Sequence, residues 1–190
     1  EILEIKYPVI QDLIAKRESW IPAGQILPTD HSAYHDHNAI KNVPADFFAA
    51  AYYCRMYKDV AEIARILGKD EDAALYESRF ITAKNAFNAK YYVADKKDYT
   101  PGHQGGIVIP VAYGIADEDT IPGLMETLHR YIVDNTYHLT CGFASTERIL
   151  GILADYGVRA QTGFAAIAAF RANAAQMHAL GMNHISAAGV

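Results

Sequence analysis

The segment Tyr34-His35-Asp36-His37 gathers side chains that bind polar ligands. Carboxylate and imidazole groups exchange hydrogen bonds with hydroxyl groups, and a tyrosine ring offers a flat face to a sugar ring. Imidazole and carboxylate also bind Zn²⁺, but neighbouring side chains of an extended segment point to opposite sides, so only His35 and His37 can converge. His31 is the one nearby candidate for a third ligand, and we predict no metal site. Sugar binding fits these residues better, with a solvated polar loop as the alternative.

A second polar stretch, residues 138–146, lies directly in front of a helical pattern. We expect Gly142 to turn the chain sharply and Ser145 or Thr146 to cap the helix that follows. The free N–H groups of a helix N-terminus then face oxygen-rich ligands. In the alternative interpretation, His138 only satisfies a buried turn.

Other chemistries lack their motifs. Residues 142–146 follow no strand, so Ser145 does not sit on the strand-to-helix elbow that presents a nucleophilic serine. No glycine-rich phosphate loop or dinucleotide fingerprint occurs, and we expect no cofactor. The 13 tyrosines are compatible with a carbohydrate cleft, although most of them fit helical cores.

Helical periodicity runs through most of the chain, and it predicts an all-α fold of about seven helices in antiparallel pairs. The helices are expected at residues 2–19, 44–67, 69–87, 107–115, 117–132, 147–156 and 161–172. No strand of any length is predicted. The connections 25–43, 91–106 and 135–145 are long and polar whereas the others are tight, which places one functional face at one set of helix ends.

Composition restricts the class of protein. The chain has 190 residues, of which 51% are hydrophobic, and a formal net charge of -5, as in a soluble domain with a sizeable core. The absence of a basic cluster argues against nucleic acid, and no apolar run is long enough to cross a membrane. Cys54 and Cys141 are expected to be buried thiols. Because Glu1 already lies in a helical pattern, we expect a piece of a longer protein, and a secreted, periplasmic or cytoplasmic location all remain open.

An ordered set of segments resembles the inverting α-L-rhamnosidases of glycoside hydrolase family 78. The matching segments, which together span about residues 44–163, are Ala50-Ala51-Tyr52-Tyr53, residues 63–73 with Tyr76, Phe87-Asn88, Gln104, and residues 138–146 followed by Leu150, Leu153 and Gly157. The resemblance implies that residues 1–190 form a single all-α domain, an incomplete C-terminal portion of an (α/α)6 barrel. It also implies inverting hydrolysis of terminal α-L-rhamnose from glycans or glycosides.

The resemblance also assigns site residues. Many members have Tyr-Gly-Asp-Trp where this chain has residues 34–37, so Asp36 is expected to contact the sugar, and His37 replaces the tryptophan. We expect the substrate-binding residues to be Asp36, His138, Tyr34, His35 and His37. The family's general base falls at Ala187, and its general acid lies upstream of the region that Glu1 matches. The catalytic residues are therefore unassigned, and the chain alone is expected to be inactive.

A non-catalytic helical module that binds carbohydrate or protein is the rival hypothesis. Part of a twelve-helix ring leaves an open apolar edge, which seeks a partner. The expected partners are a carbohydrate and either the remainder of the same barrel or a second copy of the chain.

Overall fold

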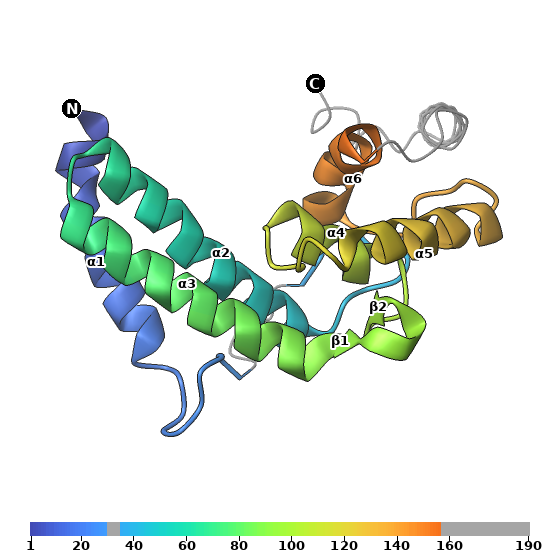
Figure 1. Cartoon of the computed structure of the whole chain (residues 1–190), viewed down its shortest axis with the longest axis horizontal. Coiled ribbons are helices and arrows are strands. Elements are labelled where there is room, and N and C mark those ends of the chain that lie inside the picture. Colours follow the sequence, from blue (N-terminus) through green and yellow to red (C-terminus); the bar gives the residue numbers. More distant parts are fainter. Residues whose placement is uncertain (30–34, 157–190) are drawn as a thin grey trace.

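The computed structural model describes residues 1–29 and 35–156, and this part of the chain is mainly helical (Figure 1). Its elements are α1 (Ile2–Glu18), α2 (Ala45–Ile66), α3 (Asp70–Tyr91), β1 (Tyr92–Val93), a 3₁₀ turn (Ala94–Lys96), β2 (Asp98–Tyr99), α4 (Gln104–Ala112), α5 (Ile121–Asp134) and α6 (Phe143–Asp155). Six of the seven predicted helices lie here. The seventh, at residues 161–172, falls outside the described residues.

The helices α2 and α3 form one long antiparallel hairpin (Figure 1). Gly68 ends α2 in the left-handed region at φ +67°, which glycine adopts without strain. The amide of Lys69 then donates to the carbonyl of Ala64 at 2.9 Å, closing the last turn of α2. Asp70, Glu71 and Asp72 occupy the first turn of α3, where acidic side chains suit the helix dipole. The predicted hairpin is confirmed.

Aromatic side chains fill the core where the hairpin meets the chain that follows it. Phe47 is fully buried, and its ring contacts those of Phe87, Tyr91 and Tyr99 edge-on at centroid distances of 5.0 to 6.2 Å. Tyr99 belongs to β2, which pairs antiparallel with β1, and its hydroxyl donates to the side-chain oxygen of Asn88 at 2.8 Å. The prediction of no strand is wrong here, because two-residue strands carry no readable alternation.

The helix α1 lies against α2 and α3 and is held there by polar contacts at both ends. The hydroxyl of Tyr7 donates to Asp72 at 2.9 Å. The carboxylate of Glu18 accepts from Tyr57 at 2.5 Å and from Arg79 at 2.6 Å. These contacts fix the end of α1 that leads into the first long loop.

The opposite face of α1 is an apolar stripe without cover in the described part of the chain. Its side chains are 52 to 75% exposed and belong to Ile2, Ile5, Val9 and Leu13. Their spacing puts them on one side of the helix. A contiguous stripe of this kind normally contacts another part of a protein.

The helices α4, α5 and α6 form a second group beside the hairpin (Figure 1). The helix α4 includes the apolar run at residues 107–111, as predicted, and nearly all of it is buried. The structure begins α5 at Ile121, a few residues later than predicted, and α6 at Phe143, four residues earlier than the predicted Glu147. The described helices are all too short or too polar to cross a membrane.

We predict that Phe47→Ala lowers the free energy of unfolding by about 3 to 5 kcal/mol, because it removes a ring on which three others pack. Ile66→Ala is the control, since Ile66 ends α2 and is largely exposed. Chemical denaturation of the 190-residue chain measures both variants. Equal losses for Phe47→Ala and Ile66→Ala would contradict this view of the core.

Candidate functional site

The carboxylate of Asp36 is fully buried against the first turn of α6. One oxygen accepts from the amide of Gly142 at 2.8 Å and from the hydroxyl of Ser145 at 2.7 Å. The other accepts from the amides of Ala144 and Ser145 at 3.0 and 3.3 Å. Asp36 thus caps α6 from another part of the sequence, and neither Ser145 nor Thr146 is the capping residue.

The chain next to Asp36 completes the same contact. The amide of Phe143 donates to the carbonyl of His37 at 3.0 Å, so every N–H from Gly142 to Ser145 has a partner in residues 36 and 37. The backbones approach so closely that a Cβ on Gly142 would lie 2.3 Å from the carbonyl oxygens of both Asp36 and His37. The φ of Gly142 is -91°, which suits any residue, so the backbone conformation does not require glycine. The lack of space for a side chain does.

Gln104 and Lys41 hold the second predicted loop against the first. The side chain of Gln104 donates to the carbonyl of His138 and accepts from the amide of Thr140, both at 2.9 Å. The amide of Lys41 donates to the carbonyl of Thr140, also at 2.9 Å. The loops that carry Asp36 and His138 therefore meet at one end of the helices.

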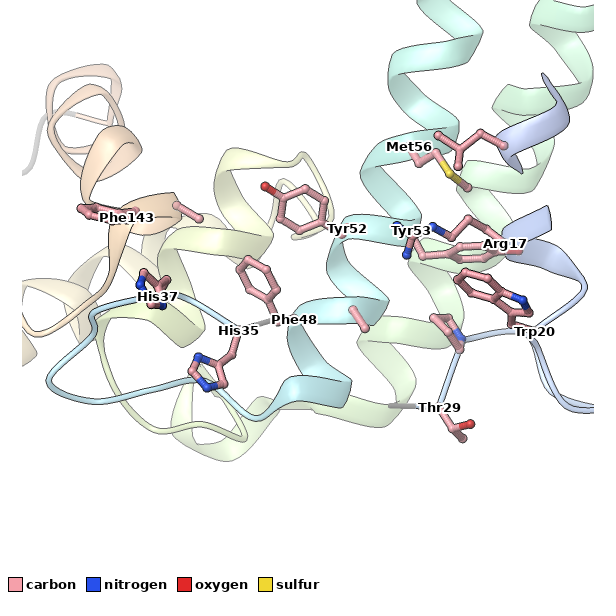
Figure 2. A pocket seen from close by; sticks show the side chains of 14 residues that line it. Arg17, Trp20, Thr29, His35, His37, Phe48, Tyr52, Tyr53, Met56 and Phe143 are labelled. Atoms are coloured by element: carbon pink, nitrogen blue, oxygen red, sulfur yellow. The ribbon is translucent and has the colours of Figure 1, made fainter. Parts of the chain in front are cut away.

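His35 and His37 face a pocket while Asp36 between them points into the protein (Figure 2). This is the alternation expected of an extended segment. The Nδ1 atom of His35 is buried and has no hydrogen-bond partner, and the ring of His37 lies 5.9 Å from that of Phe143. Two imidazoles are thus presented on one side of the segment.

The pocket, called here the α1–α2–α6 pocket, has a volume of about 550 Å³. Besides the two histidines, it is lined by Leu13, Arg17 and Trp20 near the end of α1, Pro28 and Thr29, Phe48, Ala49, Tyr52, Tyr53 and Met56 of α2, and Phe143 and Ala144 of α6. Figure 2 shows Arg17 and Trp20 at one end and His37 with Phe143 at the other. Aromatic faces with a few polar groups are typical of a ligand pocket.

The predicted site residues are distributed unequally around this pocket. His35 and His37 line it, whereas Asp36 does not and instead accepts hydrogen bonds from the start of α6. His138 does not line it, and its Nδ1 atom lies 3.1 Å from the carbonyl oxygen of Asn135. Tyr34 lies outside the described residues, as does Ala187.

Sequence reasoning missed the wall contributed by α1 and α2. The spacing of Phe48 and Tyr52 puts both on one face of α2, and their rings lie 4.9 Å apart. The hydrophobic periodicity of the sequence predicts that these residues share a face, but not whether that face lines a pocket or packs into the core. Trp20 follows the helix predicted at residues 2–19, and nothing local in the sequence places it at a pocket shared with α2.

Among residues 1–29 and 35–156, no aspartate or glutamate lines the α1–α2–α6 pocket. Within residues 1–29 and 35–156, no three histidine, cysteine or acidic side chains come together as a metal site would require. The pocket therefore offers aromatic faces, two imidazoles and one guanidinium, which suit binding of a hydroxyl-rich ring rather than proton transfer between carboxylates.

Burial lowers the pKa of His103, which precedes α4 beneath the two loops, and the nearby charge of Lys41 lowers it further. The carbonyl of Asn42, 3.2 Å from its Nε2 atom, and the charges of Asp98 and Asp36 act in the opposite direction but do not prevail. Its Nδ1 atom is buried without a partner. His103 is therefore held in its neutral form.

We predict that Gly142→Ala lowers the free energy of unfolding by about 3 kcal/mol, because the added methyl group meets two backbone carbonyls that cannot move independently. Gly151→Ala, in the interior of the same helix, meets no atom within 4 Å and is expected to stabilise by up to about 1 kcal/mol. Thermal unfolding by circular dichroism measures both. If the two variants unfold alike, the close approach at Gly142 is refuted.

The neutral state of His103 predicts a pH dependence of stability. A histidine with a lower pKa in the folded protein binds its proton more weakly there, so the unfolded chain takes up protons as the pH falls below about 6.5 and stability is lost. His103→Gln should therefore show a smaller decrease in Tm between pH 7.5 and 5.5 than the unchanged chain. The exposed His37→Gln is the control, and an equal pH slope for the unchanged chain and His103→Gln would refute the prediction.

The family model for the bacterial alpha-L-rhamnosidase 6 hairpin glycosidase domain matches residues 3–172. An alpha-L-rhamnosidase of Streptomyces avermitilis is 28% identical over 156 residues, which cover 78% of this chain and 15% of that protein. The chain thus spans about one seventh of this relative's length.

Two solved structures share the fold. The Streptomyces avermitilis alpha-L-rhamnosidase, solved in complex with L-rhamnose, superposes with a TM-score of 0.75 at 25% identity, covering 82% of this chain and 15% of that one. The alpha-L-rhamnosidase from Dictyoglumus thermophilum gives 0.73 at 23% identity, covering 83% and 18%. Both likenesses support the predicted portion of an (α/α)6 barrel. With the family model matching most of its length, this chain belongs to the bacterial alpha-L-rhamnosidase 6 hairpin glycosidase family.

Proposed function

We propose that the protein containing this chain hydrolyses terminal α-L-rhamnose from glycans or glycosides with inversion, and that this chain supplies part of the wall that holds the sugar. The observation that carries the proposal is the α1–α2–α6 pocket, where His35 and His37 stand opposite the aromatic rings of α2. Its volume of about 550 Å³ is within the usual range for small-molecule sites. The relatives named alpha-L-rhamnosidase support the choice of sugar.

The proposal gives each predicted site residue a role. The imidazoles of His35 and His37 hydrogen-bond the hydroxyl groups of the sugar, and Tyr34, outside the described residues, stays a predicted sugar contact. Asp36 acts through the backbone, because all its hydrogen-bonding capacity in this structure is directed to α6. His138 belongs to the neighbouring loop that Gln104 holds in place at the edge of the cleft.

Proton transfer is assigned to other parts of the protein. Inversion needs a carboxylic acid and a carboxylate about 6.5 to 9.5 Å apart, flanking the scissile bond. The described residues of the pocket lining supply neither, and the buried carboxylate of Asp36 already accepts four hydrogen bonds. We therefore expect the 190-residue chain to bind sugar without turnover.

The remainder of the six-hairpin domain is the proposed partner of this chain. The family model describes six hairpins, whereas the described residues form about half that number of helix pairs. The part of the apolar stripe outside the pocket, which consists of Ile2, Ile5 and Val9, gives such a partner a surface to cover. This assembly, rather than a free-standing binding module, accounts for an uncovered helix face beside a half-formed cleft.

We predict that the parent protein releases the chromophore from a p-nitrophenyl α-L-rhamnoside and that the 190-residue chain does not. Product anomers followed by NMR should show inversion. Turnover of no rhamnoside or related deoxysugar by the parent protein would reject the activity.

In the parent protein, His37→Ala should raise KM about fivefold, because one hydrogen bond to the sugar contributes about 1 kcal/mol. His129→Gln on α5, away from the pocket, is the matched control and should leave KM unchanged. An unchanged KM for His37→Ala would remove that residue from the sugar site while leaving the activity itself in place.

A further inference from the structure

Arg17 gives the α1–α2–α6 pocket an unbalanced positive charge. Of the lining residues that the structure describes, it alone has a permanent charge, and its side chain is exposed. It forms no ion pair with any residue that the structure describes, and its guanidinium lies over the indole ring of Trp20. An arginine that faces a pocket without an acidic partner is available to an anion from outside.

Two acidic side chains that contact or belong to α1 are already engaged. Glu18, the next residue, accepts from Tyr57 and Arg79, whose guanidinium neutralises it. Asp72 accepts from the hydroxyl of Tyr7 at the other end of α1. Neither offers a free carboxylate to Arg17.

Trp20 adds a flat apolar face to this charge. Its ring is 42% exposed, and the guanidinium carbon of Arg17 and the ammonium of Lys16 lie 5.4 and 5.9 Å from the ring centroid. An indole face packs against the C–H side of a sugar ring, while a guanidinium pairs in a bidentate manner with a planar oxyanion. Together they match one ligand, a sugar that carries a negative charge.

The position of the pair relates it to the rest of the pocket. Figure 2 shows Arg17 and Trp20, with Tyr53 near them, at the end farthest from His37 and Phe143, and Phe48 and Tyr52 between the two ends. We propose that Arg17 and Trp20 form a subsite for an acidic sugar, adjacent to the sugar that His35 and His37 hold. This rests on the proposed function and narrows its substrates to glycans in which the released sugar is joined to an anionic one.

Isothermal titration calorimetry with the 190-residue chain tests the subsite without requiring turnover. The probes are digalacturonate, galactose 6-sulfate and neutral galactobiose. The two acidic probes should bind about tenfold more tightly than galactobiose, and Arg17→Gln should remove that difference. Arg17→Lys should retain part of it, because lysine keeps the charge and loses the planar fork. Tighter binding of digalacturonate than of the sulfate identifies a carboxylate as the preferred anion, and the reverse order identifies a sulfate ester.

Two further variants separate charge from stacking. Arg65→Gln is the matched control, since Arg65 pairs with Glu62 and Glu77 near the far end of α2, and it should bind as the unchanged chain does. Trp20→Ala should weaken all three probes. The subsite is refuted if acidic and neutral probes bind equally, or if Arg17→Gln binds digalacturonate like the unchanged chain. Failure of the parent protein on rhamnosides would reject the proposed function without altering these affinities.

Discussion

The buried carboxylate of Asp36 is the contact on which the architecture of the site depends. A carboxylate removed from water is tolerated only when donors replace its hydration, and the first turn of a helix supplies such donors in a fixed arrangement. Three amides and the hydroxyl of Ser145 do so here. These hydrogen bonds satisfy the carboxylate and the helix alike, because the amides at the start of α6 also need acceptors. The position of the loop that carries Asp36 and the residue at which α6 begins therefore depend on each other.

The histidine wall follows from that contact. With Asp36 directed inward, the extended backbone directs both neighbouring imidazoles outward, towards α2. The hydrogen bonds that Glu18 accepts from Tyr57 and Arg79 hold the end of α1 at the opposite end of the α1–α2–α6 pocket. These elements line the pocket with aromatic rings, two imidazoles and one guanidinium, and its described lining holds no carboxylate.

Local sequence predicts the elements whose causes are local. The α2–α3 hairpin was predictable because its periodicity, its acidic first turn and Gly68 are neighbours in the chain. The early start of α6 was not, because its cap comes from Asp36 and not from the adjacent Ser145 or Thr146. Sequence likewise predicted that His35 and His37 share a side. It did not indicate that Asp36 is buried against α6. It also did not place Trp20 and Arg17 at the pocket, because their position depends on how α1 packs.

The distance in sequence between Asp36 and its partners bears on the order of assembly. The two sides of the contact are separated by 106 to 109 residues, so closing it joins the ends of a very long loop of chain. Contacts of such separation form late in folding, after the local α2–α3 hairpin. During synthesis on the ribosome, the segment with both histidines emerges well before Ser145 does. The part of the pocket wall that carries His35 and His37 thus acquires its final shape only after the chain that forms α6 has left the exit tunnel.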